Sequence, residues 1–240
     1  MKRRSFAAGL LAPARPLRAV VLISANAEWA PVRAHFPRAV IQRSPFGEYF
    51  AEDGLVFFHG GWGKIAAAAS AQYVIDRFQP RLVVNLGTCG GMEGAIALGA
   101  TVLAVKTVVY DIVERMGDAE EAIRDYATVL DVSWLRVPDP MPVVRGTLAS
   151  ADRDLDPNDI ADLRRRYGAV AADWESGAIA WTAARNKTRL LILRTVSDMV
   201  SVKGGEAYGD PEVFRKRTVG IMERLVQALP AWLEAAGAGR

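Results

Sequence analysis

The sequence has 240 residues, of which 51% are apolar and 24% charged, with a formal net charge of +3; these values are typical of one globular domain and exclude global disorder. A single cysteine and two histidines exclude an intrachain disulfide and a cysteine-rich metal site, and they argue against a histidine-built zinc site. No apolar run approaches the ~20 residues of a membrane-spanning helix, and neither a zinc-finger spacing nor a basic-aromatic stripe indicates a nucleic-acid partner.

The beginning of the chain differs from the rest in its basic charge. It reads MKRRSFAAGLLAPA, with basic residues before a short apolar stretch, and its Arg-Arg pair resembles a twin-arginine export signal. The apolar stretch, residues 6–12, is at the short limit for such a signal. We therefore predict a basic extension over residues 1–16, a single domain over residues 17–240 and a cytoplasmic location, with export as the alternative.

The predicted elements alternate between strands and helices. Continuous β-branched apolar runs indicate strands buried on both faces, and Ala-rich or amphipathic segments indicate helices. In the first half we expect strands over 18–24, 40–43, 48–51, 55–59 and 81–87 and helices over 25–36 and 64–78. In the second half we expect strands over 100–109, 143–150, 169–172 and 189–196, helices over 157–167, 174–185 and 211–236, and loop with some helix over 118–132. The alternation predicts an α/β sheet that is largely parallel and covered on both faces.

Polar or glycine-rich segments follow four of the predicted buried strands, at the ends where ligands gather in α/β sheets. These segments contain Asn26 with Glu28, then Gly87 to Gly91, then Asp173 to Glu175, and finally Ser197 with Asp198. We therefore expect Glu28, Glu175 and Asp198 to converge on one crevice. Each acid taken alone could instead cap a helix or a turn, and the glycine segment could be a tight strand-to-helix turn, since it matches neither the dinucleotide fingerprint nor the P-loop.

Six short motifs span most of the chain: SANAEW (24–29), GGWGKIAAA (60–68), NLGTCGG (85–91), ASADRDL (149–155), AADWESGAIA (171–180) and RTVSDMV (194–200). In this order they resemble the nucleoside phosphorylase/nucleosidase superfamily, and most closely its 5′-methylthioadenosine/S-adenosylhomocysteine nucleosidases. The resemblance implies a three-layer phosphorylase/hydrolase-like α/β fold with a central mixed, partly barrel-like sheet flanked by helices. It implies no metal or organic cofactor. It also implies a homodimer in which a neighbour's loop completes the pocket, near the strand over 100–110.

The same resemblance implies roles for individual residues. Asp198 would protonate N7 of the leaving purine, and Glu28 would accept a proton from the attacking water. Glu175 would bind the ribose hydroxyls, and Ser197 would orient Asp198. The other pocket residues would be Thr88, Cys89, Gly90, the backbone of Leu155 at the base edge, and Trp174, which stands where the family usually has Met.

This chemistry suits the residue types. A purine is a poor leaving group as an anion, so its departure needs a carboxylic acid that burial keeps protonated near neutral pH. The sugar left behind resembles an oxocarbenium cation, which nearby carboxylates stabilise. A second acid can then activate water, as in the two-carboxylate glycosidases.

The choice between water and phosphate depends on two positions. At the position of Asn85, the phosphorylases that this chain resembles have an Arg that binds phosphate. The neutral amide of Asn85 lacks the guanidinium group that binds phosphate through two hydrogen bonds. Glu28 would repel a phosphate dianion but suits water activation. We therefore predict a purine nucleosidase acting on an adenine nucleoside such as 5′-methylthioadenosine or S-adenosylhomocysteine. The alternatives are a phosphate-dependent phosphorylase, an inactive nucleoside-binding module of the same fold, and an α/β protein whose acids merely cap helices.

Three departures from the family pattern concern the ends of the pocket. An aromatic base-stacking residue is expected near Arg153 or Asp154, Trp174 is bulkier than Met, and the turn that holds Glu28 is one residue shorter. They leave the natural nucleoside open, so that a related hydrolase of futalosine, AMP or another nucleoside is a further alternative.

Overall fold

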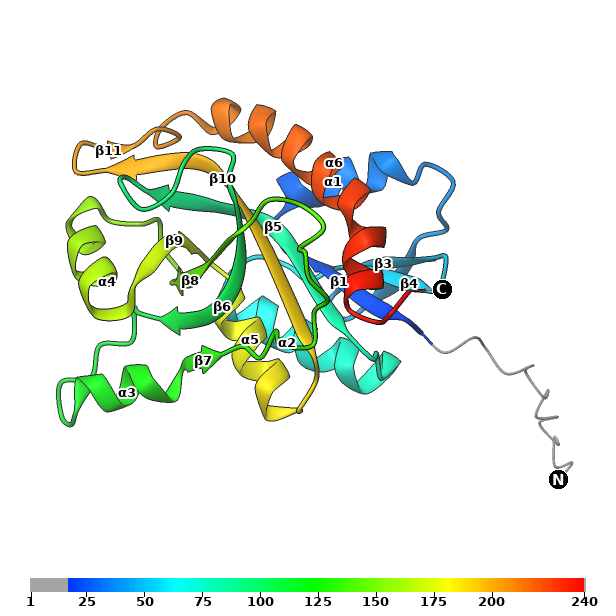
Figure 1. The fold of residues 1–240 in the computed structure, drawn as a ribbon, viewed down its shortest axis with the longest axis horizontal. Helices are drawn as coiled ribbons and strands as arrows, with labels where there is room; N and C mark the ends of the chain where they lie inside the picture. The colour runs from blue at the N-terminus through cyan, green and yellow to red at the C-terminus, as the bar shows by residue number, and fades with distance from the viewer. Residues whose placement is uncertain (1–16, 240) are drawn as a thin grey trace, which may run out of the picture.

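The computed structural model describes residues 17–239 (Figure 1). The basic extension predicted over residues 1–16 lies outside the described residues. The alternative prediction of an export signal concerns the same residues. The strands are β1 Ala19–Ile23, β2 Gln42–Ser44, β3 Gly47–Glu52, β4 Leu55–His59, β5 Val83–Met92, β6 Thr101–Val109, β7 Ala127–Val129, β8 Val144–Ser150, β9 Ala169–Asp173, β10 Leu190–Ser201 and β11 Gly204–Gly205. The helices are α1 Asn26–His35, α2 Gly63–Phe78, α3 Ala119–Asp125, α4 Ile160–Tyr167, which follows a 3-10 turn at Pro157–Asp159, α5 Ser176–Arg185 and α6 Pro211–Ala235.

The strands of the described range form one mixed sheet. Its order is β11-β10-β6-β8-β9-β5-β1-β4-β3-β2, with β7 paired to β6. Because β10 also pairs with β5, the five strands β10, β6, β8, β9 and β5 close into a barrel. The predicted α/β fold with a mixed, partly barrel-like sheet is therefore confirmed. The largely parallel sheet expected from alternation alone is wrong, because β6 runs antiparallel to β10 and β9 runs antiparallel to β5.

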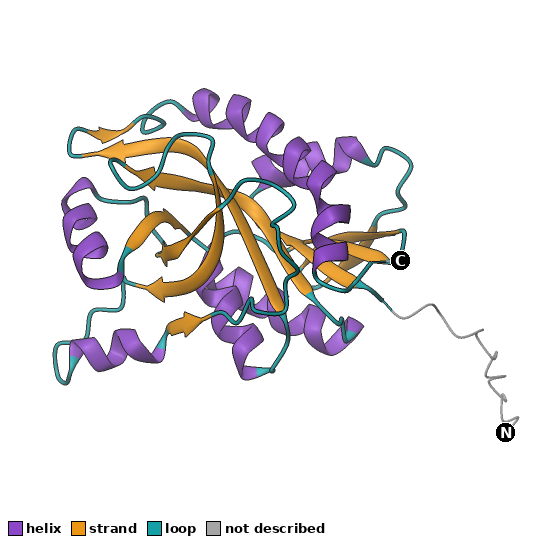
Figure 2. Cartoon of the chain, in the orientation of Figure 1, coloured by secondary structure: helices purple, strands orange, loops and turns teal. Residues whose placement is uncertain are grey.

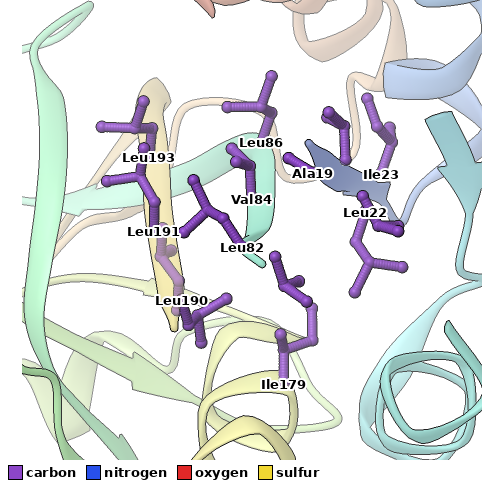
Figure 3. Close-up of a cluster of buried hydrophobic side chains, with 14 of the residues drawn as sticks. Ala19, Leu22, Ile23, Leu82, Val84, Leu86, Ile179, Leu190, Leu191 and Leu193 are labelled. Carbon is purple, nitrogen blue, oxygen red and sulfur yellow. The ribbon is translucent and has the colours of Figure 1, made fainter. Parts of the chain in front are cut away.

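Helices cover the sheet on both sides. Helix α1 packs against α6, and α2 packs against α5 on another side of the sheet (Figure 2). The strands between them are buried on both faces, which explains their continuous apolar sequences. Figure 3 shows the resulting core, in which apolar side chains of β1, β5, β10 and α5 lie together, among them Leu22, Val84, Leu86, Ile179, Leu191 and Leu193.

Two central strands are longer than the sequence pattern predicts. Gly87 to Gly91, expected to follow a strand as a loop, lie within β5, because β10 pairs with β5 along this stretch and β9 pairs with its end. Ser197 and Asp198, expected to follow the last strand, lie within β10, where the register shifts between Val196 and Asp198. The uncertain stretch over 118–132 forms α3 and β7. Within residues 17–239, no helix is long and apolar enough to cross a membrane.

Candidate active site

One cavity of about 390 Å³ collects all nine predicted site residues. They come from the first turn of α1, from the middles of β5 and β10, from the short segment between β9 and α5, and from the loop after β8. The nine residues are Glu28, Thr88, Cys89, Gly90, Leu155, Trp174, Glu175, Ser197 and Asp198. The closed barrel explains this convergence, because it brings β5, β9 and β10 together although they are far apart in sequence.

A second cavity, of about 720 Å³, lies between α1, α6 and the β3–β4 hairpin. Although it is larger, it contains none of the predicted site residues, and its polar lining groups are chiefly surface side chains such as Arg18 and Glu52. A catalytic site needs positioned and desolvated polar groups. We therefore place the candidate site in the smaller cavity, where buried carboxylates gather.

Glu28 is fixed at the start of α1. Its Oε1 accepts hydrogen bonds from the backbone N–H of Thr88 at 2.6 Å and from the Thr88 hydroxyl at 2.8 Å. Its Oε2 accepts one from the Ala25 N–H at 3.2 Å, which closes the first helical turn. The side chain is only 2% exposed. Glu28 is therefore a desolvated, oriented carboxylate.

Arg194 lies at the centre of the site, and the sequence analysis assigned it no role. Its side chain is 1% exposed and forms ion pairs with Glu28 at 3.5 Å, Asp173 at 3.1 Å and Glu175 at 3.3 Å. It also donates to the side-chain oxygen of Asn85 at 3.0 Å. Burial opposes the charge of Arg194, but the three carboxylates outweigh it and raise its pKa. The sequence signal that could have identified Arg194 is its position inside the apolar run over 189–196. A charged residue in a buried strand must have a charged or hydrogen-bonding partner, so it marks a polar site.

Glu175 and Asp173 flank Trp174 at the end of β9. Glu175 accepts a hydrogen bond from the Gly63 N–H at 3.2 Å and pairs with Arg194. Burial raises the pKa of Glu175 to about 8, with Asp173 and Glu28 competing for the same guanidinium. Asp173 accepts from the Ser150 hydroxyl at 2.6 Å and caps α5 through the Ser176 N–H at 3.1 Å. The N-cap position of α5 is Glu175, two residues after Asp173, and Glu175 lines the cavity.

Asp198 occupies the irregular point of β10. It is 7% exposed, and burial raises the pKa of its carboxyl above the ordinary value. The Ser197 hydroxyl lies 2.7 Å from Asp198 Oδ1 and donates to it, while Arg217 donates to the Ser197 carbonyl at 3.0 Å. Asp198 is thus an oriented carboxyl, and burial shifts its pKa in the direction that a proton donor requires, although the Ser197 hydrogen bond acts against that shift.

Aromatic side chains stand at the remaining walls. Trp174 stacks on Trp62 with ring centroids 5.0 Å apart, beside the Gly63 that contacts Glu175. The Leu155 carbonyl, predicted to face the base edge, accepts a hydrogen bond from the Tyr208 hydroxyl at 2.7 Å. Sequence analysis quoted Trp62 within the GGWGKIAAA motif but gave it no role, and it did not single out Tyr208; both residues lie outside the helices and strands.

The arrangement combines a proton donor, a carboxylate that can hold water, and a buried guanidinium with its acidic partners. Within residues 17–239, no group of three or more histidine, cysteine, aspartate or glutamate side chains is arranged to hold a metal ion. The chemistry that these side chains can perform themselves is proton transfer and stabilisation of a transient positive charge.

Comparison with known proteins finds relatives that match most of this chain. Residues 25–230 match the model of the phosphorylase superfamily. Among curated proteins, the 5′-methylthioadenosine/S-adenosylhomocysteine nucleosidase of Bacillus pumilus is 25% identical over 66% of this chain and 74% of its own length. The protein of the same name from Thermotoga maritima is 27% identical over 70% of this chain and 72% of its own length.

Solved structures show the same fold. The Campylobacter jejuni nucleosidase of that name superposes with a TM-score of 0.72 and 18% identity, over 91% of this chain and 98% of its own. The Neisseria meningitidis nucleosidase, solved in complex with methylthio-immucillin-A, superposes with a TM-score of 0.69 and 20% identity, over 90% of this chain and 100% of its own.

Proposed function

The chain belongs to the phosphorylase superfamily, and from this membership we propose that it is a nucleosidase that hydrolyses the N-glycosidic bond of an adenine nucleoside. The observation that carries the proposal is the pairing, in one cavity, of a buried Asp198 with a raised pKa and a buried, hydrogen-bonded Glu28. The names of its relatives indicate 5′-methylthioadenosine and S-adenosylhomocysteine as substrates.

In the proposed reaction the bond between C1′ and N9 breaks, and its electron pair leaves with the purine. Asp198 gives its proton to N7, so the base departs as a neutral molecule. Glu175 binds the ribose hydroxyls, and the carboxylates of the site stabilise the cationic sugar. Water adds its oxygen to C1′ and passes a proton to Glu28. The products are the free base and the free sugar.

Hydrolysis is favoured over phosphorolysis by the local charge. Although the Arg194 guanidinium reaches Asn85, three carboxylates already engage it, namely Glu28, Asp173 and Glu175. Even when Glu175, with its pKa of about 8, is protonated, two other acids still face one guanidinium, and the remaining negative charge repels a phosphate dianion and accepts neutral water.

We also propose that the protein acts as a homodimer. Val113 and Met116, in the segment that follows β6, are 71% and 97% exposed, and Trp62 at the cavity is 67% exposed. Trp62 lines the cavity, and exposed apolar side chains suit contact with a second copy, whose corresponding segment would cover the cavity.

The proposal is tested by incubating the protein with 5′-methylthioadenosine in phosphate-free buffer. We expect release of adenine together with an equal amount of reducing sugar, at a rate that added phosphate does not change.

Glu28→Gln should lower kcat by about 10²–10⁴-fold, because it removes the acceptor of the water proton. Glu52→Gln, at an exposed glutamate of β3, is the matched control and should leave kcat unchanged. Base release that requires phosphate and yields a sugar phosphate would identify a phosphorylase instead.

A further inference from the structure

The first turn of helix α2 is capped by two acids that come from other parts of the chain. The residue before α2 is Trp62, whose indole has no oxygen that could accept a hydrogen bond from the helix. Instead, the Gly63 N–H donates to Glu175 at 3.2 Å. The next N–H, that of Lys64, donates to Asp152 at 2.7 Å. The orientation of Glu175 therefore depends on where this turn of α2 is held.

Asp152 is fixed in the loop after β8 by two further residues. The Lys64 ammonium forms an ion pair with Asp111 and lies 3.7 Å from the second carboxylate oxygen of Asp152. The Asp152 N–H donates to the Asp111 carboxylate at 2.9 Å. The side chains of Lys64 and Asp111 are 21% and 18% exposed, so their attraction is less screened by water than that of a surface pair. These contacts join the start of α2 to the loops after β6 and β8.

Gly63 is a position at which the structure leaves little room for a side chain. Its φ of +82° lies in the left-handed region that favours glycine. A Cβ built there would lie only 3.0 Å from Oδ1 of Asp152. The Asp152 carboxylate therefore packs directly against the residue whose N–H binds Glu175, and a displacement of Asp152 would displace that N–H.

Of the residues in this arrangement, only Glu175 lines the cavity. Burial raises the pKa of Glu175, and the neighbouring Asp173 and Glu28 act in the same direction. Arg194 and the Gly63 N–H act against this rise, because both favour the carboxylate. The first turn of α2 therefore influences the direction of the Glu175 side chain as well as its charge.

We infer that Asp152 is a positioning residue for Glu175, because it holds the Gly63 N–H against this carboxyl. Lys64 and Asp111 in turn hold Asp152 in place. The consequence for ribose binding rests on the proposed nucleosidase function, whereas the contact between α2 and Glu175 does not. Asp152 acts through this contact alone and takes no part in the proton transfers.

Nuclear magnetic resonance tests the contact without a substrate. In the wild-type protein the chemical shift of the Gly63 amide should follow the ionisation of Glu175, with a pKa of about 8, and in Glu175→Gln this titration should be absent. In Asp152→Ala the amplitude of the Gly63 titration should fall by about half or more, because the turn loses its cap. Asp152→Asn keeps an acceptor for the helix N–H and should retain the titration. A Gly63 amide that does not titrate in the wild type, or titrates equally in Asp152→Ala, overturns the inference.

The consequence for binding is measured by calorimetry with the 7-deaza analogue of 5′-methylthioadenosine, which lacks the N7 that must be protonated and therefore stays intact. Asp152→Ala should weaken binding of this nucleoside by about tenfold or more, and Asp152→Asn by less than about threefold. Free adenine has no ribose, so its affinity should change by less than about threefold in both variants. Lys64→Met should weaken nucleoside binding by about threefold to tenfold, and Lys64→Arg should restore it.

A double-mutant cycle shows whether Asp152 acts through Glu175. In a Glu175→Ala background, Asp152→Ala should cause no further loss of nucleoside affinity, since two changes that remove one contact are not additive. Asp139→Ala, which removes a carboxylate paired with Arg145 at 2.7 Å, is the matched control and should leave nucleoside binding unchanged.

Equal weakening of nucleoside and adenine binding in Asp152→Ala, or additive effects with Glu175→Ala, would show that Asp152 merely stabilises the fold, and would overturn the inference while the nucleosidase proposal stands. A wild-type protein that neither binds the analogue nor cleaves 5′-methylthioadenosine contradicts the nucleosidase proposal. The Gly63 titration then decides by itself whether Asp152 positions Glu175.

Discussion

Arg194 and its acidic partners illustrate how a buried charge is made tolerable. The guanidinium is 1% exposed, yet it has three carboxylates within 3.5 Å and the Asn85 oxygen at 3.0 Å. Removing a charge from water costs several kcal/mol, so such a group persists only when it is paired and hydrogen-bonded. Burial raises the pKa of Glu175 to about 8, and because the acids outnumber the guanidinium, Arg194 does not offset this rise.

This raised pKa predicts a pH dependence of stability. In the folded state Glu175 keeps its proton up to a pH of about 8, whereas in the unfolded chain it loses the proton near the ordinary glutamate pKa of 4.5. Its contribution is therefore fully present below the unfolded pKa and is lost as pH rises through the folded one. Relative to Glu175→Gln, the free energy of unfolding of the wild type should fall over this window, by about 1.4 kcal/mol per pH unit at most.

Urea denaturation of both proteins at several pH values measures this difference. Glu52→Gln, at an exposed glutamate, should show no such trend. A difference between wild type and Glu175→Gln that is constant from pH 5 to pH 8 would show that the carboxyl is ionised throughout.

At the scale of elements, the site depends on two long neighbouring strands. β5 and β10 pair along their whole shared length, and the glycines of β5 allow bulky groups to approach it. A Cβ at Gly87 would meet the Arg194 guanidinium and lie 2.7 Å from Glu28 Oε1. Gly87 thus makes room for the contact between Arg194 and Glu28.

Gly87→Ala should therefore damage the site more than the fold. We expect kcat/KM to fall by about 100-fold or more, because both groups must move, and the free energy of unfolding to fall by about 1–3 kcal/mol, as for other overpacked positions. The control is Gly220→Ala in α6, where the nearest side-chain atom is 3.8 Å from a built Cβ. It should keep full activity and raise stability by up to about 1 kcal/mol. A folded Gly87→Ala protein with wild-type kcat/KM would mean that this contact is dispensable.

The sequence predicted most elements but not the full length of the two strands that carry the site. An apolar run in the sequence indicates the part of a strand that packs in the hydrophobic core. The later parts of β5 and β10 consist of glycine and polar residues that line the cavity, so they carry no apolar run. Gly87 to Gly91 and Asp198 belong to strands because they pair with neighbouring strands, and these pairings depend on tertiary structure. β11 has two residues and no pattern of its own, so the sequence offered no signal for it.

At the scale of the whole molecule, closure of the barrel is what assembles the cavity. Glu28 and Asp198 are 170 positions apart in the sequence, and they line one cavity because β10 closes the ring with β5. Motif resemblance predicted that these residues gather in a mixed, partly barrel-like sheet, whereas strand alternation alone predicted a largely parallel one. Direction and closure depend on pairings between distant segments, which local sequence patterns do not encode. For the same reason Tyr208 and Trp62 could not be placed at the cavity in advance.

The central claim is that Asp198 gives its proton to the departing base, and Asp198→Asn tests it most directly with two substrates. Cleavage of 5′-methylthioadenosine needs leaving-group protonation, whereas 4-nitrophenyl β-D-ribofuranoside has a leaving group that departs as a stable anion. We predict that Asp198→Asn lowers kcat for the purine substrate by about 10³-fold or more and kcat for the nitrophenyl substrate by less than about tenfold. Equal losses on both substrates, or wild-type cleavage of the purine nucleoside, would contradict the role of Asp198 as the acid.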